Sequence, residues 1–295
     1  MKARLAALLC LVPLPALAQQ QDFSKVEVKA ERIVDGIYML TGSGGNIGLS
    51  VGRSGTFVID DQYAPLTDKI LAAIRAITPD PVRFVVNTHW HGDHTGGNEN
   101  MGKAGALLVA HENVRQRMGA EQFNALFNRS TPASPEAALP VVTFTDAITF
   151  HWNGDDIRVH HVKPAHTDTD SIVQFVKADV VHMGDVFFNG SYPFIDASSG
   201  GRVDGVIEAV DQALAGTGPA TRFIPGHGPA GTRADLQAYR DTVKTLRDRI
   251  AKLKAEGKSR DQAVAAKPTA DFDARWGTGF MKGDTFTGIV YDSLP

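Results

Sequence analysis

Six consecutive residues of this 295-residue chain contain four potential metal ligands: His89, His91, Asp93 and His94. Packing in a hydrophobic core does not explain such a concentration, because buried polar groups without partners are costly. Alternate residues of an extended segment share a face, so His89 and His91 can bind one ion together. The glycine before Asp93 lets the chain turn, which directs Asp93 and His94 toward a second ion. Because imidazole and carboxylate suit borderline divalent metals, the segment predicts a metal site.

Three further segments place a ligand type in a tight turn after a predicted strand. His166 follows the strand Ile157–Val162, Asp185 follows Val180–Met183, and His227 follows Arg222–Ile224. Each turn alone is weak evidence, because His-Gly and Gly-Asp pairs are common in loops. The single cysteine, Cys10, lies close to the N-terminus, so the rest of the chain offers a metal only histidine, aspartate and glutamate.

These seven residues, in this order and at separations of this size, resemble the ligand set of the metallo-β-lactamase superfamily. The resemblance extends from Val26 to about Pro229. It implies an α+β fold of the four-layer αβ/βα type, in which two packed β-sheets carry helices on their outer faces. It also implies that the first metal is bound by His89, His91 and His166, that the second is bound by Asp93, His94 and His227, and that Asp185 bridges both.

A hydrolytic mechanism follows from the same resemblance. Two divalent ions about 3.5–4 Å apart can share one water, lower its pKa to about 7 and present hydroxide to an activated carbonyl. Asp93 is the expected catalytic residue, because its carboxylate can accept a hydrogen bond from that hydroxide. Two zinc ions per chain are expected, with iron and manganese as alternatives. Asp60 ends the predicted strand Thr56–Ile59, where it either orients a histidine ligand or caps the strand.

Strand and helix signals alternate along the chain, so that strand ends lead into the ligand-bearing loops. Besides the strands given above, strands are predicted within residues 26–51, at Arg83–Val86 and at Ile172–Phe175. Helices are predicted from Pro65 onward, at Val203–Ala215 and at Ala234–Lys254. The segment Gly119–Pro140 has no clear period, which predicts a loop with a helical start. We expect one domain over residues 19–295, in which the last helix is followed by a glycine-rich tail.

The other five histidines are expected to lie outside the metal site. His111 is predicted at an exposed helix start, His151 on the surface, and His182 in the packing of a strand. His160 and His161 point to opposite faces of one strand, so one can support a ligand while the other is exposed. Candidates for the substrate pocket are the aromatic and polar residues of the site loops, namely Tyr63, Trp90, Phe187, Phe188, Asn189, Tyr192 and Phe194.

The N-terminus has the features of a cleaved export signal. Basic residues at positions 2 and 4 precede an apolar run that is shorter than the roughly 20 residues of a membrane-spanning helix. Ala16 and Ala18 supply the small residues that favour cleavage after Ala18. We therefore expect residues 1–18 to be a signal peptide, the mature protein to have no membrane anchor, and its location to be periplasmic or secreted. Removing the two basic residues changes the net charge from −3 to −5, which disfavours nucleic acid and leaves a small molecule as the expected partner.

The leading functional prediction is an exported hydrolase that opens a β-lactam, lactone or ester. The best-known β-lactamases of the family carry cysteine at the position of Asp185, followed by a lysine that binds the carboxylate of the drug. The run Asp185–Asn189 contains no lysine, which predicts weak β-lactam hydrolysis and better turnover of neutral lactones and esters. An anionic substrate would then need an anchor from another loop, such as Lys163 or Arg202.

Three alternative functions remain open. Relatives with a similar pattern oxidise persulfides with a single iron, although the presence of both His94 and His227 favours two metals. Glutathione thioesterases of the family carry a separate C-terminal helical domain with basic residues, which one long helix and a tail do not provide. A non-enzymatic periplasmic metal-binding protein would close its site around one ion.

Overall fold

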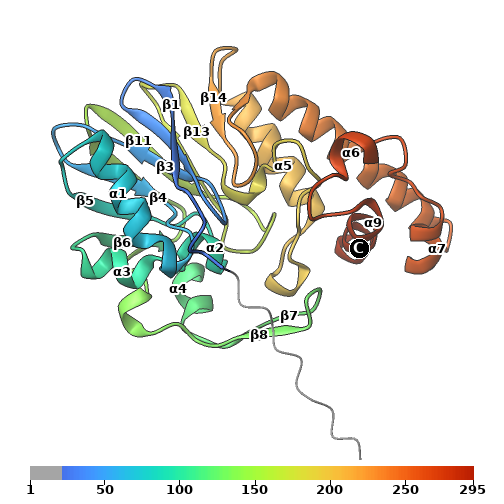
Figure 1. The fold of residues 1–295 in the computed structure, drawn as a ribbon. Coiled ribbons are helices and arrows are strands. Elements are labelled where there is room, and N and C mark those ends of the chain that lie inside the picture. The colour runs from blue at the N-terminus through green and yellow to red at the C-terminus, as the bar shows by residue number, and fades with distance from the viewer. Residues whose placement is uncertain (1–21) are drawn as a thin grey trace, which may run out of the picture.

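Two β-sheets form the centre of the computed structural model, which describes residues 22–295 (Figure 1). The signal peptide predicted at residues 1–18 lies outside the described residues. The first sheet consists of β1 (Lys29–Val34), β2 (Ile37–Thr41), β3 (Ile47–Ser50), β4 (Thr56–Ile59), β5 (Val82–Val86), β6 (Leu107–His111) and β9 (Val142–Phe144), side by side in that order. Its strands are antiparallel from β1 to β4 and parallel from β4 to β9.

The second sheet consists of β10 (Ala147–Trp152), β11 (Asp155–His161), β12 (Ser171–Phe175), β13 (Val180–His182), β14 (Arg222–Ile224) and β15 (Gly231–Thr232), also in chain order. Only β13 and β14 pair in parallel. Between the sheets lies one apolar cluster, to which Phe57 and Val86 contribute from one side and Val159, Val173 and Ile224 from the other. Burial of these β-branched and aromatic side chains holds the two sheets face to face.

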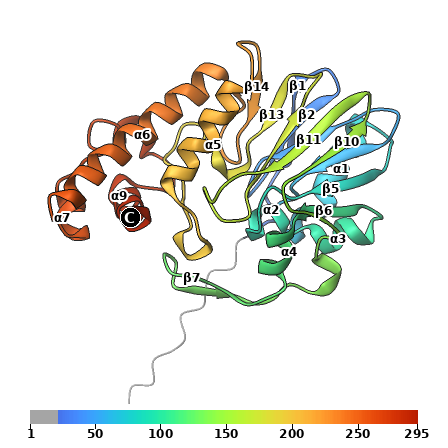
Figure 2. The same cartoon turned by 180° about the vertical axis from the view of Figure 1, so that it is seen from behind.

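Helices cover the outer face of each sheet, as the two opposite views show (Figures 1 and 2). The first sheet carries α1 (Thr67–Ile77), α2 (Gly92–Thr95), α3 (Asn98–Lys103) and α4 (Glu112–Met118), and the second carries α5 (Val203–Ala215) and α6 (Arg233–Ala255). In α1, Ile70 and Ile74 lie one turn apart and are buried against Val58 and Val85. A capping box of Thr232 and Asp235 begins α6. The expected four-layer sandwich is therefore confirmed.

The segment 119–140 differs from the sequence-based prediction. No helix occurs at its start: α4 ends at Met118, and the chain then forms a two-stranded hairpin of β7 (Gln122–Asn124) and β8 (Arg129–Thr131). The predicted helical start is therefore wrong. Both strands are short and mostly exposed, so they carry none of the apolar alternation that marks a buried strand. Four short 3-10 helices also occur among the described residues, at Ala64–Leu66, Glu136–Ala138, Gly184–Val186 and Ala197–Ser199.

The C-terminal region is also more structured than predicted. After α6 the chain forms α7 (Arg260–Ala265), α8 (Asp273–Trp276) and α9 (Gly283–Ser293) instead of a tail. These helices pack beside α6, where Phe286 and Val290 join the apolar cluster of the second sheet (Figure 1). Short helices separated by glycine-containing turns give little periodic signal, which is why the sequence did not reveal them. Within residues 22–295, none of the helices combines the length and apolar character needed to cross a membrane.

Candidate metal centre

The predicted ligands come together at one edge of the two sheets. His89 follows β5, His166 follows β11, Asp185 follows β13 and His227 follows β14. Because β5 belongs to the parallel part of the first sheet and β13 and β14 are parallel in the second, the carboxyl ends of these strands lead into neighbouring loops. The result is two groups of side chains. Within each group, the ligand atoms lie within 4.8 Å of one another. The first group is His89, His91, His166 and Asp185, and the second is Asp93, His94 and His227.

The first group is arranged as a receptor for a cation. His91 Nδ1 lies 2.8 Å from His166 Nε2. The outer nitrogen of His166 contacts the Phe194 carbonyl oxygen at 2.7 Å, and that of His91 contacts the Asp196 carboxylate at 3.0 Å. The carbonyl and the carboxylate can only accept a hydrogen bond, so the outer nitrogen of each ring donates. In the neutral rings, His91 Nδ1 and His166 Nε2 then carry no hydrogen, and their lone pairs face each other. Such a pair repels unless a positive ion lies between them. Burial lowers the pKa of His166 to about 4, which keeps the ring in its ligand form at neutral pH.

The second group shares the Asp185 carboxylate with the first. Asp185 Oδ1 lies 3.1 Å from His94 Nε2, and Asp185 Oδ2 lies 3.4 Å from both His166 Nε2 and His227 Nε2. His227 Nε2 is also 3.4 Å from Asp93 Oδ2. Burial opposes the charge of Asp185, but His227 and His94 hold its pKa well below the usual range. Asp185 is therefore an ionised carboxylate placed between the two groups, where a bridging ligand is needed.

Three buried atoms of the centre have no hydrogen-bond partner among the described residues: His89 Nε2, His94 Nε2 and Asp185 Oδ1. Leaving a buried polar atom unpaired costs about 1–3 kcal/mol, so three of them pointing at one space need an explanation. Metal ions would supply it, because nitrogen and carboxylate oxygen donors of this kind suit zinc and other borderline divalent metals. The residues present therefore fit two metal ions.

Asp60 orients one of the ligands, as the sequence suggested. Its buried carboxylate lies 2.7 Å from His94 Nδ1 and accepts hydrogen bonds from the Thr88 backbone and hydroxyl at 2.7 and 2.8 Å. The contact fixes the His94 ring with Nε2 toward Asp185. Asp60 holds a left-handed backbone conformation with φ of 62°. Such strain persists only where the surroundings enforce it, and it is common at functional sites.

The remaining histidines lie outside the two groups. His151 is exposed, as predicted, and contacts Asp156. His182 is buried on β13 against the Asn46 carbonyl oxygen. The exposure predicted for His111 is wrong: its ring is buried, donates to the Thr145 carbonyl oxygen at 2.7 Å and stacks on His161 at 3.7 Å. His111 lies at the carboxyl end of buried β6, so the preceding strand rather than the following helix decides its burial. Neither His160 nor His161 contacts a ligand.

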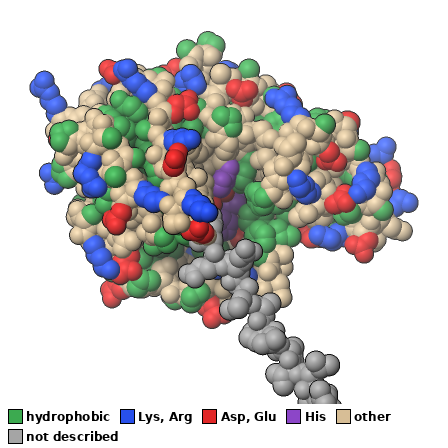
Figure 3. All heavy atoms as spheres, in the orientation of Figure 1, with side chains coloured by type: hydrophobic (Ala, Val, Ile, Leu, Met, Phe, Trp, Pro, Cys, Tyr) green, Lys and Arg blue, Asp and Glu red, His purple; other side chains and the backbone are tan. Residues whose placement is uncertain are grey.

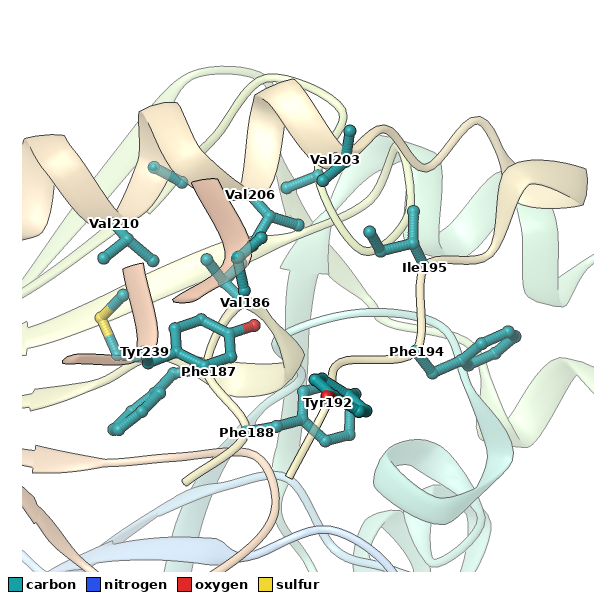
Figure 4. Packing of buried hydrophobic residues seen from close by; sticks show 14 of the residues in the cluster. Val186, Phe187, Phe188, Tyr192, Phe194, Ile195, Val203, Val206, Val210 and Tyr239 are labelled. Atoms are coloured by element: carbon teal, nitrogen blue, oxygen red, sulfur yellow. The ribbon is translucent and has the colours of Figure 1, made fainter. Parts of the chain in front are cut away.

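A cavity of about 460 Å³ opens over the ligands, and Asp93, Asp185 and His227 reach its wall. Of the aromatic residues proposed for a substrate pocket, Tyr63, Trp90, Phe188 and Phe194 line it. Phe187 and Tyr192 do not: Phe187 packs on Tyr239 in the cluster under α5 (Figure 4). Tyr192 stacks on Phe286. Asn189 does not line the cavity either, because its amide donates to the Pro229 carbonyl oxygen. Those three predictions are wrong.

The cavity also has walls that the sequence did not indicate. The hairpin contributes Asn124, Phe127, Arg129 and Thr131, and the turn before α9 contributes Phe280. The space-filling view shows histidine side chains in a hollow beside a band of hydrophobic surface (Figure 3). The two basic residues considered as anchors lie elsewhere: Lys163 pairs with Glu208, and Arg202 does not line the cavity. Arg129 is the basic residue that lines the cavity.

Comparison with known proteins agrees with this architecture. Residues 40–251 match the family model of the metallo-beta-lactamase superfamily. The fold is similar to that of the inverting sec-alkylsulfatase Pisa1 from Pseudomonas sp., with a TM-score of 0.69 and 18% identity over 90% of this chain and 50% of that one. It is also similar to a metallo-beta-lactamase from Pontibacter korlensis (TM-score 0.60, 20% identity, 74% of this chain and 99% of that one) and to the DIM-1 metallo-beta-lactamase (0.60, 20%, 75% and 99%). This chain spans about half the length of the alkylsulfatase, and at these identities the likeness concerns the fold alone.

Proposed function

Because the chain belongs to the metallo-β-lactamase superfamily, we propose that it is an exported, zinc-dependent hydrolase that cleaves an activated carbonyl compound such as a lactone, an ester or a β-lactam. One observation carries the proposal above all: two groups of ligands that share Asp185 open directly onto a cavity of about 460 Å³. A site that only stores or senses metal closes its ligands around the ion, whereas a catalytic site keeps an open position. A cavity of this size can enclose a small organic substrate.

Two bound zinc ions would supply a water of lowered pKa and polarise the substrate carbonyl. The side chains around them perform the remaining tasks. Asp93 is 22% exposed and faces the cavity. Burial raises the pKa of Asp93, but His94 and His227 more than offset this and hold it at about 2. The ionised carboxylate can therefore accept a hydrogen bond from the attacking water and hold its lone pair toward the substrate.

Tyr63 offers a proton donor on the same wall. Burial and the nearby Asp93 raise the pKa of Tyr63 to about 12, so its hydroxyl stays protonated at neutral pH. A hydroxyl facing the cavity can donate to the oxygen on which negative charge develops. The rings of Trp90, Phe188 and Phe194 exclude water from the rest of the wall, which strengthens both polar interactions.

Metal analysis combined with a substrate panel tests the proposal. Purified mature protein should contain about two zinc ions per chain and hydrolyse members of a panel of lactones, esters, thioesters and β-lactams. A single iron per chain together with oxygen consumption on persulfides would instead establish the dioxygenase alternative. Two zinc ions without turnover of any member would contradict the proposed substrate class.

Sulfate esters are a second candidate substrate class. The fold match to the alkylsulfatase covers 90% of this chain, against 74% and 75% for the two β-lactamases. Secondary alkyl sulfates therefore belong in the panel. If the protein releases inorganic sulfate from them and leaves carbonyl esters intact, the proposed function becomes hydrolysis of sulfate esters at the same centre.

Export is the remaining part of the proposal. It rests on the basic start, the short apolar run and the small residues before Gln19. Mass spectrometry of protein from the periplasm or the culture medium should find an N-terminus at Gln19 or within a few residues of it. An intact Met1 in that fraction would contradict signal cleavage.

A further inference from the structure

The inner face of the β7–β8 hairpin forms one wall of the cavity. Asn124 pairs with Arg129 across the two strands, and Gln122 pairs with Thr131. Alternate residues of a strand share a face, so these four side chains lie on the same side of the hairpin. Three of them line the cavity, and Thr131 also lines a second, smaller cavity of about 160 Å³ beside it. The hairpin therefore presents a polar face to the metal centre.

Arg129 is the basic residue of this face. Two other basic side chains are neutralised by carboxylates: Arg117 on α4 pairs with Asp168, and Lys163 pairs with Glu208. Within residues 22–295, by contrast, Arg129 has neither a carboxylate partner nor a hydrogen bond. The two carboxylates on the cavity wall, Asp93 and Asp185, are directed at His227. A guanidinium group without a partner is thus available to a ligand in the cavity, with a geometry that suits a carboxylate or sulfate.

The surroundings of Arg129 are apolar. Phe127, in the turn of the hairpin, is 55% exposed and lies 5.5 Å from the ring of Phe194 across the opening. Phe280, from the turn before α9, is 61% exposed and lines the same cavity. Apolar surface that is gathered around a cavity, unlike single exposed side chains, is typical of a site that contacts a ligand or a partner. Three rings around one positive charge suit a molecule with an apolar body and an anionic group.

We infer that Arg129 is a specificity-determining residue that binds an anionic group of the substrate, and that the preferred substrates are amphipathic esters or lactones whose carboxylate or sulfate is remote from the scissile bond. The hydrolytic part of this inference rests on the proposed function. The apolar body of the substrate lies between Phe127, Phe194 and Phe280, which leaves its activated carbonyl directed at the metal ligands. A neutral substrate lacks the contact with Arg129, so we expect the cavity to prefer anionic substrates to neutral ones.

Matched pairs of esters test this assignment. Mono-para-nitrophenyl esters of glutarate, adipate and suberate carry a terminal carboxylate, which the corresponding para-nitrophenyl alkanoates lack. With the wild-type enzyme we expect a lower KM for at least one dicarboxylate ester than for its neutral counterpart, and a KM that rises with ionic strength. Arg129→Ala should raise the KM of the anionic ester by about tenfold and abolish its salt dependence, while neutral esters change by less than about twofold. Arg129→Lys, which keeps the charge, should retain part of the preference.

Arg53→Ala serves as the matched control, because Arg53 is exposed and does not line the cavity. Calorimetry with phenylbutyrate and the neutral phenylbutanol on the zinc-loaded protein separates this inference from the proposed function. Arg129→Ala should weaken the binding of phenylbutyrate and leave that of phenylbutanol unchanged, whether or not any ester is hydrolysed. If the wild type hydrolyses no ester at all, that result counts against the proposed function and not against the role of Arg129. Equal binding of phenylbutyrate by wild type and Arg129→Ala, or an equal loss for both ligands, would overturn the role of Arg129.

Discussion

The carboxylate of Asp196 lies 3.0 Å from Nε2 of His91, although 105 positions separate the two residues in the chain. Asp196 is buried and also accepts hydrogen bonds from the Ser199 hydroxyl and the Ser198 backbone. Burial raises the pKa of Asp196, but the contact with His91 outweighs it and holds the pKa at about 2. An ionised partner on the outer nitrogen fixes the orientation of the His91 ring and leaves its inner nitrogen free for a metal.

Asp196→Asn should therefore weaken metal binding without removing a ligand. The amide keeps the size of the side chain but loses the charge, and loss of such a partner reduces metal affinity by about 10- to 100-fold. Competition with a chelator measures the change. The control is Asp156→Asn, because Asp156 contacts His151 at 2.7 Å on the surface, away from the metal centre. Equal zinc affinity of wild type and Asp196→Asn would show that the contact does not tune His91.

Gly226→Ala should disturb Asp185 by direct contact. A methyl group at Gly226 would lie 2.0 Å from Asp185 Oδ1 and 2.7 Å from the Gly184 backbone, so the carboxylate has to move. We expect loss of bound metal and a fall in kcat of tenfold or more, about 1.4 kcal/mol in activation free energy. At Gly218 a methyl group meets nothing within 4 Å, so Gly218→Ala should keep its metal and gain slightly in stability. A fully loaded and active Gly226→Ala variant would contradict the observed packing.

His227→Ala should reduce the metal content from two ions to one. His227 contributes Nε2 to the group that contains Asp93 and His94, so its removal leaves the second ion with one ligand fewer and less tightly held. Metal analysis after dialysis should find about one zinc per chain and little hydrolysis. His151→Ala, a substitution of an exposed histidine, should retain two zinc ions and wild-type turnover. Two tightly bound ions in His227→Ala would exclude His227 as a ligand.

The metal-free protein should lose stability as the pH rises above neutrality. Burial lowers the pKa of His227, but Asp185 and Asp93 more than offset this and raise it to about 9, from 6.5 in an unperturbed histidine. A raised pKa means that the protonated ring contributes stability that is complete below about pH 6.5 and is lost as the pH rises through 9. The pKa of His94 is shifted in the same direction. The Tm of chelator-treated protein should therefore fall between pH 6.5 and 9.

Zinc should remove most of that dependence, because the metal takes the place of the proton on the ring nitrogens. The variant His227→Ala, also free of metal, should show a smaller fall in Tm over the same range. A flat Tm for the metal-free wild type from pH 6.5 to 9 would mean that the histidine is not held in the charged form by these carboxylates.

Local patterns in the sequence were sufficient to predict most of the sandwich. The strand Thr56–Ile59 and the helix Val203–Ala215 have the predicted bounds. The strand is a short, fully buried run that ends before Asp60, and the helix repeats its apolar residues at three- and four-residue steps. The hairpin of Gln122–Asn124 and Arg129–Thr131 could not be predicted in this way, since its strands are polar and exposed. It is held instead by distant contacts, such as the hydrogen bond from the Ala125 backbone to the Ser198 hydroxyl.

The sequence alone indicated the cluster of His89, His91, Asp93 and His94, because four ligand types within six residues are kept together by the local chain. His166, Asp185 and His227 joined the expected ligand set only through the resemblance to a known family. The tertiary structure decided everything that depends on how separate segments meet. It brought Asp196 to His91 and the Phe194 carbonyl to His166, and it placed Arg129 and Phe280 on the wall of the cavity. No periodic signal encodes such contacts, because they depend on the path of the chain between the segments and on the packing that positions each of them.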